Sequence, residues 1–218
     1  MQETATHEVS ATYDAYLRLR EMILTGALPP GQKLKIEKLR ILLETGASPI
    51  REALSLLTSD MLVERFDQRG FRAAPVGRAN FDEILMLRCT MEEMALRASI
   101  KNATQDWEEM LVLAHHRMKK AQANGASDFE VAHKDFHMTL VGNALLPTLE
   151  RYCSQLYDLN IRYRYLAAGE PNYEERSVAS EHEDICNSVL AHDAALATVL
   201  LVDHYHRTGA YLSSQMDN

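Results

Sequence analysis

The chain has 218 residues, of which 46% are hydrophobic, and a formal net charge of −8 at pH 7. It contains no run of about 18 apolar residues that could cross a bilayer, and its first residues lack the apolar core of a signal peptide, so we expect a cytoplasmic protein. The three cysteines are an odd number at wide spacing, which excludes a disulfide framework and a paired-cysteine zinc site; we expect them to be reduced and buried.

The charge is distributed unevenly along the chain. Residues 13–75 carry ten Lys and Arg against eight Asp and Glu, a balance of +2, whereas residues 76–218 carry thirteen against twenty-one, a balance of −8. Two further acidic residues precede residue 13 and complete the total. A weakly basic amino-terminal part on an acidic body would confine contact with DNA to that part.

The amino-terminal part has the pattern of short helices followed by a hairpin. Residues 1–11 are polar and aperiodic and predict a disordered tail. A first helix is expected from residue 12 to 24, because apolar residues recur there at helical spacing before a turn rich in Gly and Pro. A second helix contains Ile36 and Leu39, and a third runs from Pro49 to Leu57.

Two short strands, 62–66 and 71–75, are expected around a turn at residues 67–70 that ends in glycine. Three short helices and a hairpin predict a winged helix-turn-helix at residues 12–75.

Beyond a linker at residues 76–80, every segment has helical period, so residues 81–218 are expected to form an all-α bundle. The expected helices are 81–101, 105–123, 128–142, 146–168, 173–190 and 194–214. The predicted fold class is therefore mainly α, a winged helix-turn-helix followed by a bundle of about six helices.

The sharpest sequence motif is PIREAL at residues 49–54, followed in order by Leu57, Leu62-Val63 and Gly70-Phe71. Together with the flanking residues, this set resembles the winged helix of the GntR family over about sixty residues without an internal gap. The resemblance implies a regulator of transcription that binds double-stranded DNA.

The amino end of the third helix would present backbone N–H groups, Ser48 and Arg51 to a phosphate or a base edge, and arginine is the side chain best shaped for guanine. The candidate DNA-binding residues are Lys33, Lys35, Arg40, Ser48, Pro49, Arg51, Arg69 and Gly70. For the lysines a solvated charged face is an equally good interpretation, whereas for Arg51 we favour DNA contact.

The motif departs from the family pattern where specificity is set. Gly46-Ala47-Ser48-Pro49 stands in place of the common Ser-Arg-Thr-Pro, and Glu37 stands where relatives often carry a base-contacting arginine. We therefore expect an operator that differs from the usual family sequence.

Four histidines lie on the apolar stripes of their predicted helices. His133 and His137 are four residues apart and share a face, while His182 and His204 lie on the stripes of two later helices. One such histidine is usually a satisfied core residue, but burying four without partners would cost a few kcal/mol each. One divalent ion bound by all four would satisfy them, and the cores of helix bundles are where such sites form.

Residues 81–212 resemble the FCD-type domain of the FadR branch of this family. His133 stands where that pattern has an aspartate, Phe136-His137 follows it, and Glu181-His182 and His204 come later in register. The histidine at position 133, together with the run Arg162–Tyr165, makes the chain similar to the carbon-starvation-induced group of that branch. The resemblance implies a bound metal, and a site rich in histidine favours Zn²⁺, with Ni²⁺ and then Mn²⁺ as alternatives.

The resemblance also implies a small carboxylate effector. A metal with an open position would anchor one, and Arg88, four residues before Glu92, matches a family position that can pair with a carboxylate. The alternative for Arg88 is a surface ion pair with Glu92. Arg162 is the second effector candidate, although it also fits a solvated helix edge, as does Arg164.

Two other functions fit part of the pattern. Two histidines four apart also occur in zinc proteases, but that motif needs a glutamate after the first histidine and this chain has Lys134, so we expect no enzyme. The other is a regulator for which the metal itself is the signal. We expect a homodimer on a palindromic operator, acting as a repressor that the effector releases.

Overall fold

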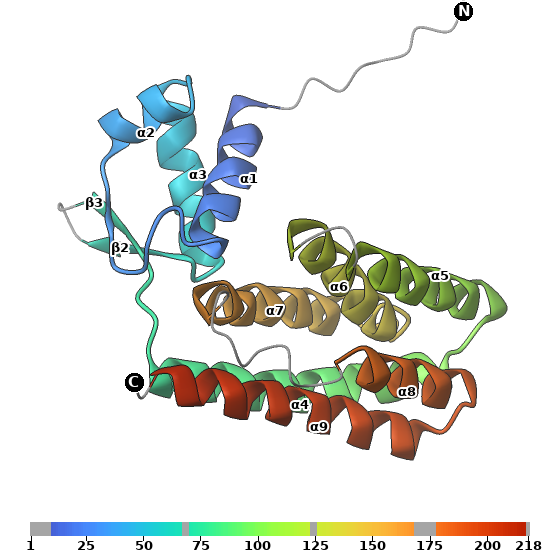
Figure 1. Cartoon of the computed structure of the whole chain (residues 1–218). Coiled ribbons are helices and arrows are strands. Elements are labelled where there is room, and N and C mark those ends of the chain that lie inside the picture. Colours follow the sequence, from blue (N-terminus) through green and yellow to red (C-terminus); the bar gives the residue numbers. More distant parts are fainter. Residues whose placement is uncertain (1–9, 67–69, 123–125, 168–177, 217–218) are drawn as a thin grey trace, which may run out of the picture. The chain divides into compact units, whose positions relative to one another are not determined.

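The computed structural model describes residues 10–66, 70–122, 126–167 and 178–216. The chain divides into two compact units, one of residues 1–76 with 161–166 and the other of residues 77–160 with 167–218 (Figure 1). None of the described helices is long and apolar enough to cross a membrane.

The described residues of the first unit that precede residue 77 form three helices and a small antiparallel sheet, which confirms the predicted fold class. The helices are α1 (Ala11–Leu24), α2 (Ile36–Leu42) and α3 (Ala47–Ser59). The strands are β1 (Lys33–Leu34), β2 (Val63–Phe66) and β3 (Gly70–Ala73), in the order β1-β3-β2.

α1 packs against α3 through side chains that are fully removed from solvent. The largest of them are Leu19, Ile23, Ile50, Leu54 and Leu57. Burying side chains of this size stabilises the unit by about 1.5–3 kcal/mol each before the entropy cost of ordering. α1 begins after Ser10, whose hydroxyl accepts from the Tyr13 amide at 3.2 Å, as an N-cap should.

The strand β1 was not predicted. Lys33 pairs with Arg72 and Leu34 with Phe71, so β3 becomes the centre of the sheet. A two-residue strand is too short to show alternation, and it forms because β3 offers a free edge. The predicted hairpin is present, with bounds shifted by one or two residues. Arg69 in its turn lies outside the described residues.

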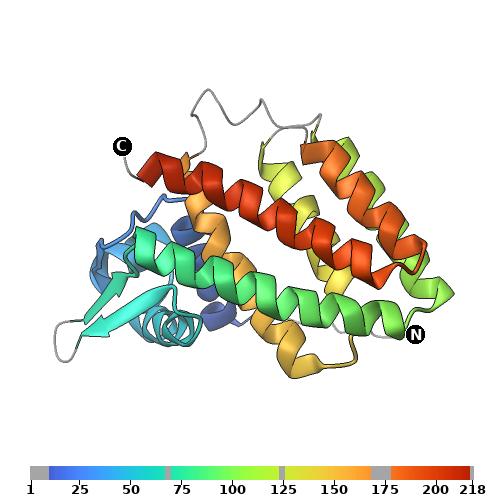
Figure 2. The same cartoon turned by 90° about the horizontal axis from the view of Figure 1, so that it is seen from below.

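The second unit consists of helices only in its described part: α4 (Arg78–Lys101), α5 (Gln105–Gln122), α6 (Ala126–Val141), α7 (Pro147–Ala167), α8 (Val178–Leu190) and α9 (Ala194–Met216). All six predicted helices are present, although the expected first turn of the fifth, from residue 173, lies outside the described residues. α4 and α9 lie side by side (Figure 2), and α8 packs on both α5 and α9.

The core of this unit is continuous and includes the three cysteines, which are free and buried as predicted. Burial raises the pKa of Cys89 and Cys186 to about 11 and that of Cys153 to about 12. α9 begins after Asp193, whose carboxylate accepts from the Leu196 amide at 2.9 Å. This cap fixes where α9 starts and therefore which of its residues face the core.

Candidate metal centre

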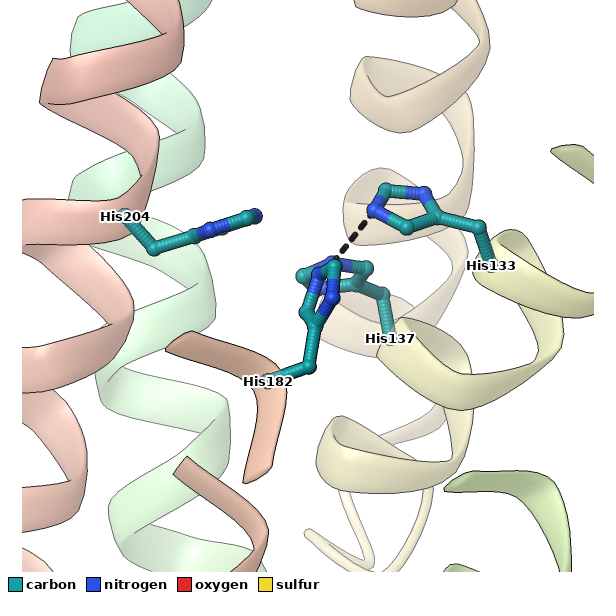
Figure 3. Close-up of side chains that lie close together, drawn as sticks. All are labelled: His133, His137, His182 and His204. Atoms are coloured by element: carbon teal, nitrogen blue, oxygen red, sulfur yellow. Dashed lines mark hydrogen bonds between the residues drawn. The ribbon is translucent and has the colours of Figure 1, made fainter. Parts of the chain in front are cut away.

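Four histidines from three helices meet in the core of the second unit. His133 and His137 come from α6, His182 from α8 and His204 from α9, and their rings point toward one another (Figure 3). One ring nitrogen of each lies within 4.8 Å of the corresponding nitrogen of every other. All four side chains are buried, with exposed fractions of 3% or less.

The spacing of the histidines within α6 brings two of them together directly. A separation of four residues places His133 and His137 one turn apart on the same face. Their ring centroids are 4.5 Å apart, and their Nε2 atoms are 3.2 Å apart. The centroids of His182 and His204 are 4.6 Å apart, because α8 and α9 pack against each other.

Three of the four rings are held from outside by their other nitrogen. His133 Nδ1 lies 2.6 Å from the Tyr157 hydroxyl, and His137 Nδ1 lies 2.9 Å from the Tyr205 hydroxyl. His204 Nδ1 lies 2.8 Å from the Glu181 carboxylate. Outer partners of this kind orient metal-binding histidines and leave Nε2 for the ion. The donor set therefore fits a divalent metal.

A buried ion pair adjoins the cluster. Arg88 Nε donates to Glu92 Oε1 at 2.7 Å, and Arg88 Nη1 donates to Asn160 Oδ1 at 2.9 Å. Arg88 is 5% exposed and Glu92 is fully buried, so the alternative of a surface pair is wrong. Burial lowers the pKa of Arg88, but the charge and hydrogen bond of Glu92 together with the neighbouring Tyr205 and Tyr157 more than compensate, and the pKa lies above its ordinary value.

The remaining amino group of Arg88, Nη2, is buried without a hydrogen-bond partner among the described residues. Its guanidinium lies over the rings of Tyr205 and Tyr157, at 4.2 and 5.0 Å from their centroids. These are the tyrosines that contact His137 and His133, so Arg88 lies next to the cluster. A buried donor without a partner costs about 1–3 kcal/mol, a cost that a bound anion would remove.

Sequence reasoning missed Tyr157, Asn160 and Tyr205. Tyr205 follows a predicted ligand directly, and Tyr157 and Asn160 are three residues apart on α7, which places them on neighbouring positions of one helix face. Periodicity signals that these residues are inward, but only the folded structure shows that Tyr157 contacts His133 and that Asn160 contacts Arg88.

Arg162 is part of the first compact unit, whereas the four histidines are part of the second. Residues 161–166 belong to the first compact unit, and within that unit Arg162 Nη2 donates to the carbonyl oxygen of Ala74 at 2.5 Å. Burial lowers the pKa of Arg162. Arg162 and Arg164 are both buried, so the interpretation of these arginines as a solvated helix edge is wrong.

In the first unit, the described DNA-binding candidates lie on the sheet, at the amino end and in the last turn of α2, and at the amino end of α3. Lys33, Lys35, Arg40, Ser48 and Arg51 are exposed, Pro49 is half-buried, and Gly70 opens β3 with φ of +94°.

Thr12 and Glu52, which the sequence analysis did not assign to the DNA-binding site, also meet near the start of α3. The Ser48 hydroxyl donates to Glu52 Oε1 at 3.3 Å, and the Thr12 hydroxyl donates to Glu52 Oε2 at 2.8 Å. Arg40 is paired with Glu37 at 3.0 Å. Arg51 is exposed on α3, and its neighbours Ser48 and Glu52 are hydrogen-bonded to other side chains of the protein.

Comparison with known proteins agrees with both units. Residues 12–72 match the model of the bacterial regulatory proteins of the gntR family, and residues 83–207 match the FCD domain. The uncharacterized HTH-type transcriptional regulator BphR of Paraburkholderia xenovorans LB400 is 34% identical over 203 residues, which are 90% of this chain and 81% of the relative. The HTH-type transcriptional repressor GlaR of Escherichia coli K12 is 29% identical over 205 residues, 88% of this chain and 90% of the relative.

Among solved structures, E. coli McbR/YncC superimposes with a TM-score of 0.82 at 23% identity, covering 95% of this chain and 99% of that one, which shows the same fold. The similarity to BphR and GlaR extends over nearly the whole chain and so includes both units. The chain therefore belongs to the GntR family of transcriptional regulators and carries an FCD domain.

Proposed function

We propose that the protein binds a palindromic DNA operator as a homodimer, and that a small carboxylate bound beside a metal in the FCD domain controls its affinity for that operator. The observation that carries this function is the convergence of four buried imidazoles beside Arg88, whose Nη2 has no partner among the described residues. Residues 12–75 are the DNA-binding domain and residues 81–218 the sensor.

The DNA-binding surface is the exposed polar group around the start of α3, with Arg51 as its central residue. One winged helix contacts too few base pairs to select a site in a genome, so two copies reading the two halves of a palindrome are needed. Lys33, Lys35 and Arg40 would contact phosphates, which makes binding strongly dependent on salt. Repression is our choice for the sign of control, supported by the name of the relative GlaR.

His133, His137, His182 and His204 would hold the metal. Imidazole nitrogen suits Zn²⁺ best among the metals considered, followed by Ni²⁺ and Mn²⁺. A bound ion would supply a Lewis-acidic anchor for a carboxylate. The chain's own contribution is orientation, since Tyr157, Tyr205 and Glu181 hold three of the rings by Nδ1.

Arg88 is the residue we assign to the effector. Glu92 and Asn160 fix two of its nitrogens, so the remaining N–H groups are held in one direction without a loss of side-chain entropy on binding. Arg162 also has a buried nitrogen without a partner among the described residues, Nε, but it belongs to the first compact unit, whereas the four histidines belong to the second. A coupling of about 1–3 kcal/mol between effector and operator would be enough for regulation.

A regulator of the metal-responsive kind is the second candidate. Four imidazoles are sufficient to complete a tetrahedral site, which needs no further ligand. In that case the metal alone would change the affinity for the operator.

Titrating zinc and small organic acids separately against a labelled operator, with fluorescence anisotropy as the readout, tests these functions. We expect zinc-loaded protein to bind DNA and a dicarboxylate to release it. Arg88→Lys keeps the charge opposite Glu92 but removes the guanidinium, and should weaken the acid's effect at least about tenfold. Arg97→Lys, in the exposed pair with Glu93 on the same helix, is the matched control. A response to zinc with none to any acid would establish the second candidate instead.

A further inference from the structure

A chain of buried hydrogen bonds runs from Arg88 through Glu92 and Tyr205 to His137. Arg88 Nε donates to Glu92 Oε1 at 2.7 Å, and the Tyr205 hydroxyl donates to Glu92 Oε2 at 2.5 Å. Arginine has donors only, and a carboxylate has acceptors only. The direction of these first two bonds is therefore fixed, and Tyr205 uses its single hydroxyl proton on Glu92.

The next bond in the chain determines where His137 carries its proton. His137 Nδ1 lies 2.9 Å from the same Tyr205 oxygen, which has no proton left to give. Nδ1 must then be the donor. A neutral imidazole has one N–H, so Nε2 is left as a bare acceptor facing the other histidines.

We propose, on the basis of the metal site proposed above, that Glu92 and Tyr205 are positioning residues that hold His137 as the Nδ1–H tautomer and so keep Nε2 ready for the ion. Neither residue is a ligand. Their action is to fix in advance the protonation pattern that a metal would otherwise have to impose.

The Glu181 carboxylate sets His204 in the same way, because it also can only accept from Nδ1.

His133 differs from these two histidines. Its Nε2 lies 3.2 Å from His137 Nε2, which carries no proton. His133 Nε2 must therefore donate across this contact in the metal-free protein. Its Nδ1 then accepts from the Tyr157 hydroxyl. Tyr157 hydrogen-bonds His133, whereas the chain from Arg88 to His137 runs through Tyr205, so Tyr157→Phe is the control for the tautomer of His137.

The decisive variant is Glu92→Gln. Arg88 would hold the amide oxygen of the new side chain, which turns its NH₂ group toward Tyr205. Tyr205 would then accept that N–H and donate its own proton to His137 Nδ1, so that Nε2 takes the proton. We expect the isosteric change to switch the tautomer of His137 and to weaken zinc binding by about 10–100-fold.

Nitrogen-15 NMR of the histidine rings in the metal-free protein measures the tautomer directly. We expect Nδ1–H for His137 in the wild type and in Tyr157→Phe, Nε2–H in Glu92→Gln, and a mixture of both forms in Tyr205→Phe. Zinc affinity, measured against a chromophoric chelator, should fall for Glu92→Gln and Tyr205→Phe and stay within about threefold for Tyr152→Phe, which changes an exposed tyrosine of α7.

Tyr205→Phe decides the matter if Glu92→Gln does not fold, since the phenyl ring keeps its place in the core. A wild-type His137 in the Nε2–H form, or a Tyr205→Phe variant that keeps both the wild-type tautomer and the wild-type zinc affinity, would overturn the assignment. Failure of the metal site itself is distinguishable, because it would appear as a wild type that binds no zinc while the tautomers in the metal-free protein remain as described.

Discussion

The two units of this regulator place their functional side chains in opposite surroundings. In the first, Arg51, Lys33 and Lys35 are exposed, and the buried side chains among residues 10–66 and 70–76 are apolar. In the second, the four histidines, Arg88 and Glu92 are themselves part of the core. A surface site can therefore be changed without affecting stability, whereas in the buried site recognition and stability depend on the same contacts.

Removing two of the four histidines should have the largest effect. We expect His137→Ala combined with His182→Ala to lower zinc affinity by roughly 10,000-fold, since structural zinc sites are worth about 10–16 kcal/mol over four ligands. Metal analysis after dialysis measures this. The control is His192→Ala with His206→Ala, two exposed histidines, which should retain zinc. Undiminished zinc in the first variant would contradict the site.

Truncating an aromatic ring should distinguish the two units by stability. Phe136 is fully buried and lies 5.5 and 5.4 Å from His137 and His182 by ring centroids. Phe136→Ala should cost about 3–5 kcal/mol in urea unfolding. Phe66 in β2 is 38% exposed and contacts Arg72, so Phe66→Ala should cost only about 0.5–1 kcal/mol. Equal losses of unfolding free energy in the two variants would show that Phe136 is no more tightly packed than Phe66.

Thiol labelling should report on the second unit alone, because Cys89, Cys153 and Cys186 all lie there. With pKa values raised to about 11 and 12, little thiolate forms at pH 8. We expect labelling on the order of 100-fold slower than for an exposed cysteine, and fast labelling in urea. Rapid labelling of the native protein would show that this unit opens more readily than its packing indicates.

Arg51→Ala should have the smallest energetic effect, and it should lower operator affinity while leaving the stability of the fold unchanged. We expect operator affinity to fall by about 1–3 kcal/mol, or roughly 5- to 150-fold, as for the loss of one arginine–guanine contact. The free energy of unfolding should change by less than about 0.5 kcal/mol. Anisotropy at fixed salt measures the first quantity. Retained affinity would show that α3 is not the recognition helix.

Periodicity predicted most of the fold because a long amphipathic helix repeats its signal several times. The convergence of His133, His137, His182 and His204 was likewise foreseeable, since each lies on an inward stripe of its own helix. The strand β1 was missed because two residues carry no repeat.

The surroundings of Arg88 could not be predicted in the same way. Its pairing with Glu92 follows from their spacing, but its burial depends on Asn160 and Tyr205, which are 72 and 113 residues away from Arg88 and Glu92 respectively. Such contacts depend on how the helices pack, which a one-dimensional pattern does not contain.

The ligands proposed for the ion are all nitrogen atoms, and this has a consequence for the cell. Peroxide oxidises sulfur ligands and so removes them from a metal, whereas imidazole does not undergo this oxidation. The only sulfhydryl groups of the chain are shut away as neutral thiols. Oxidative stress should therefore leave both the proposed ion and the proposed response to a carboxylate unchanged.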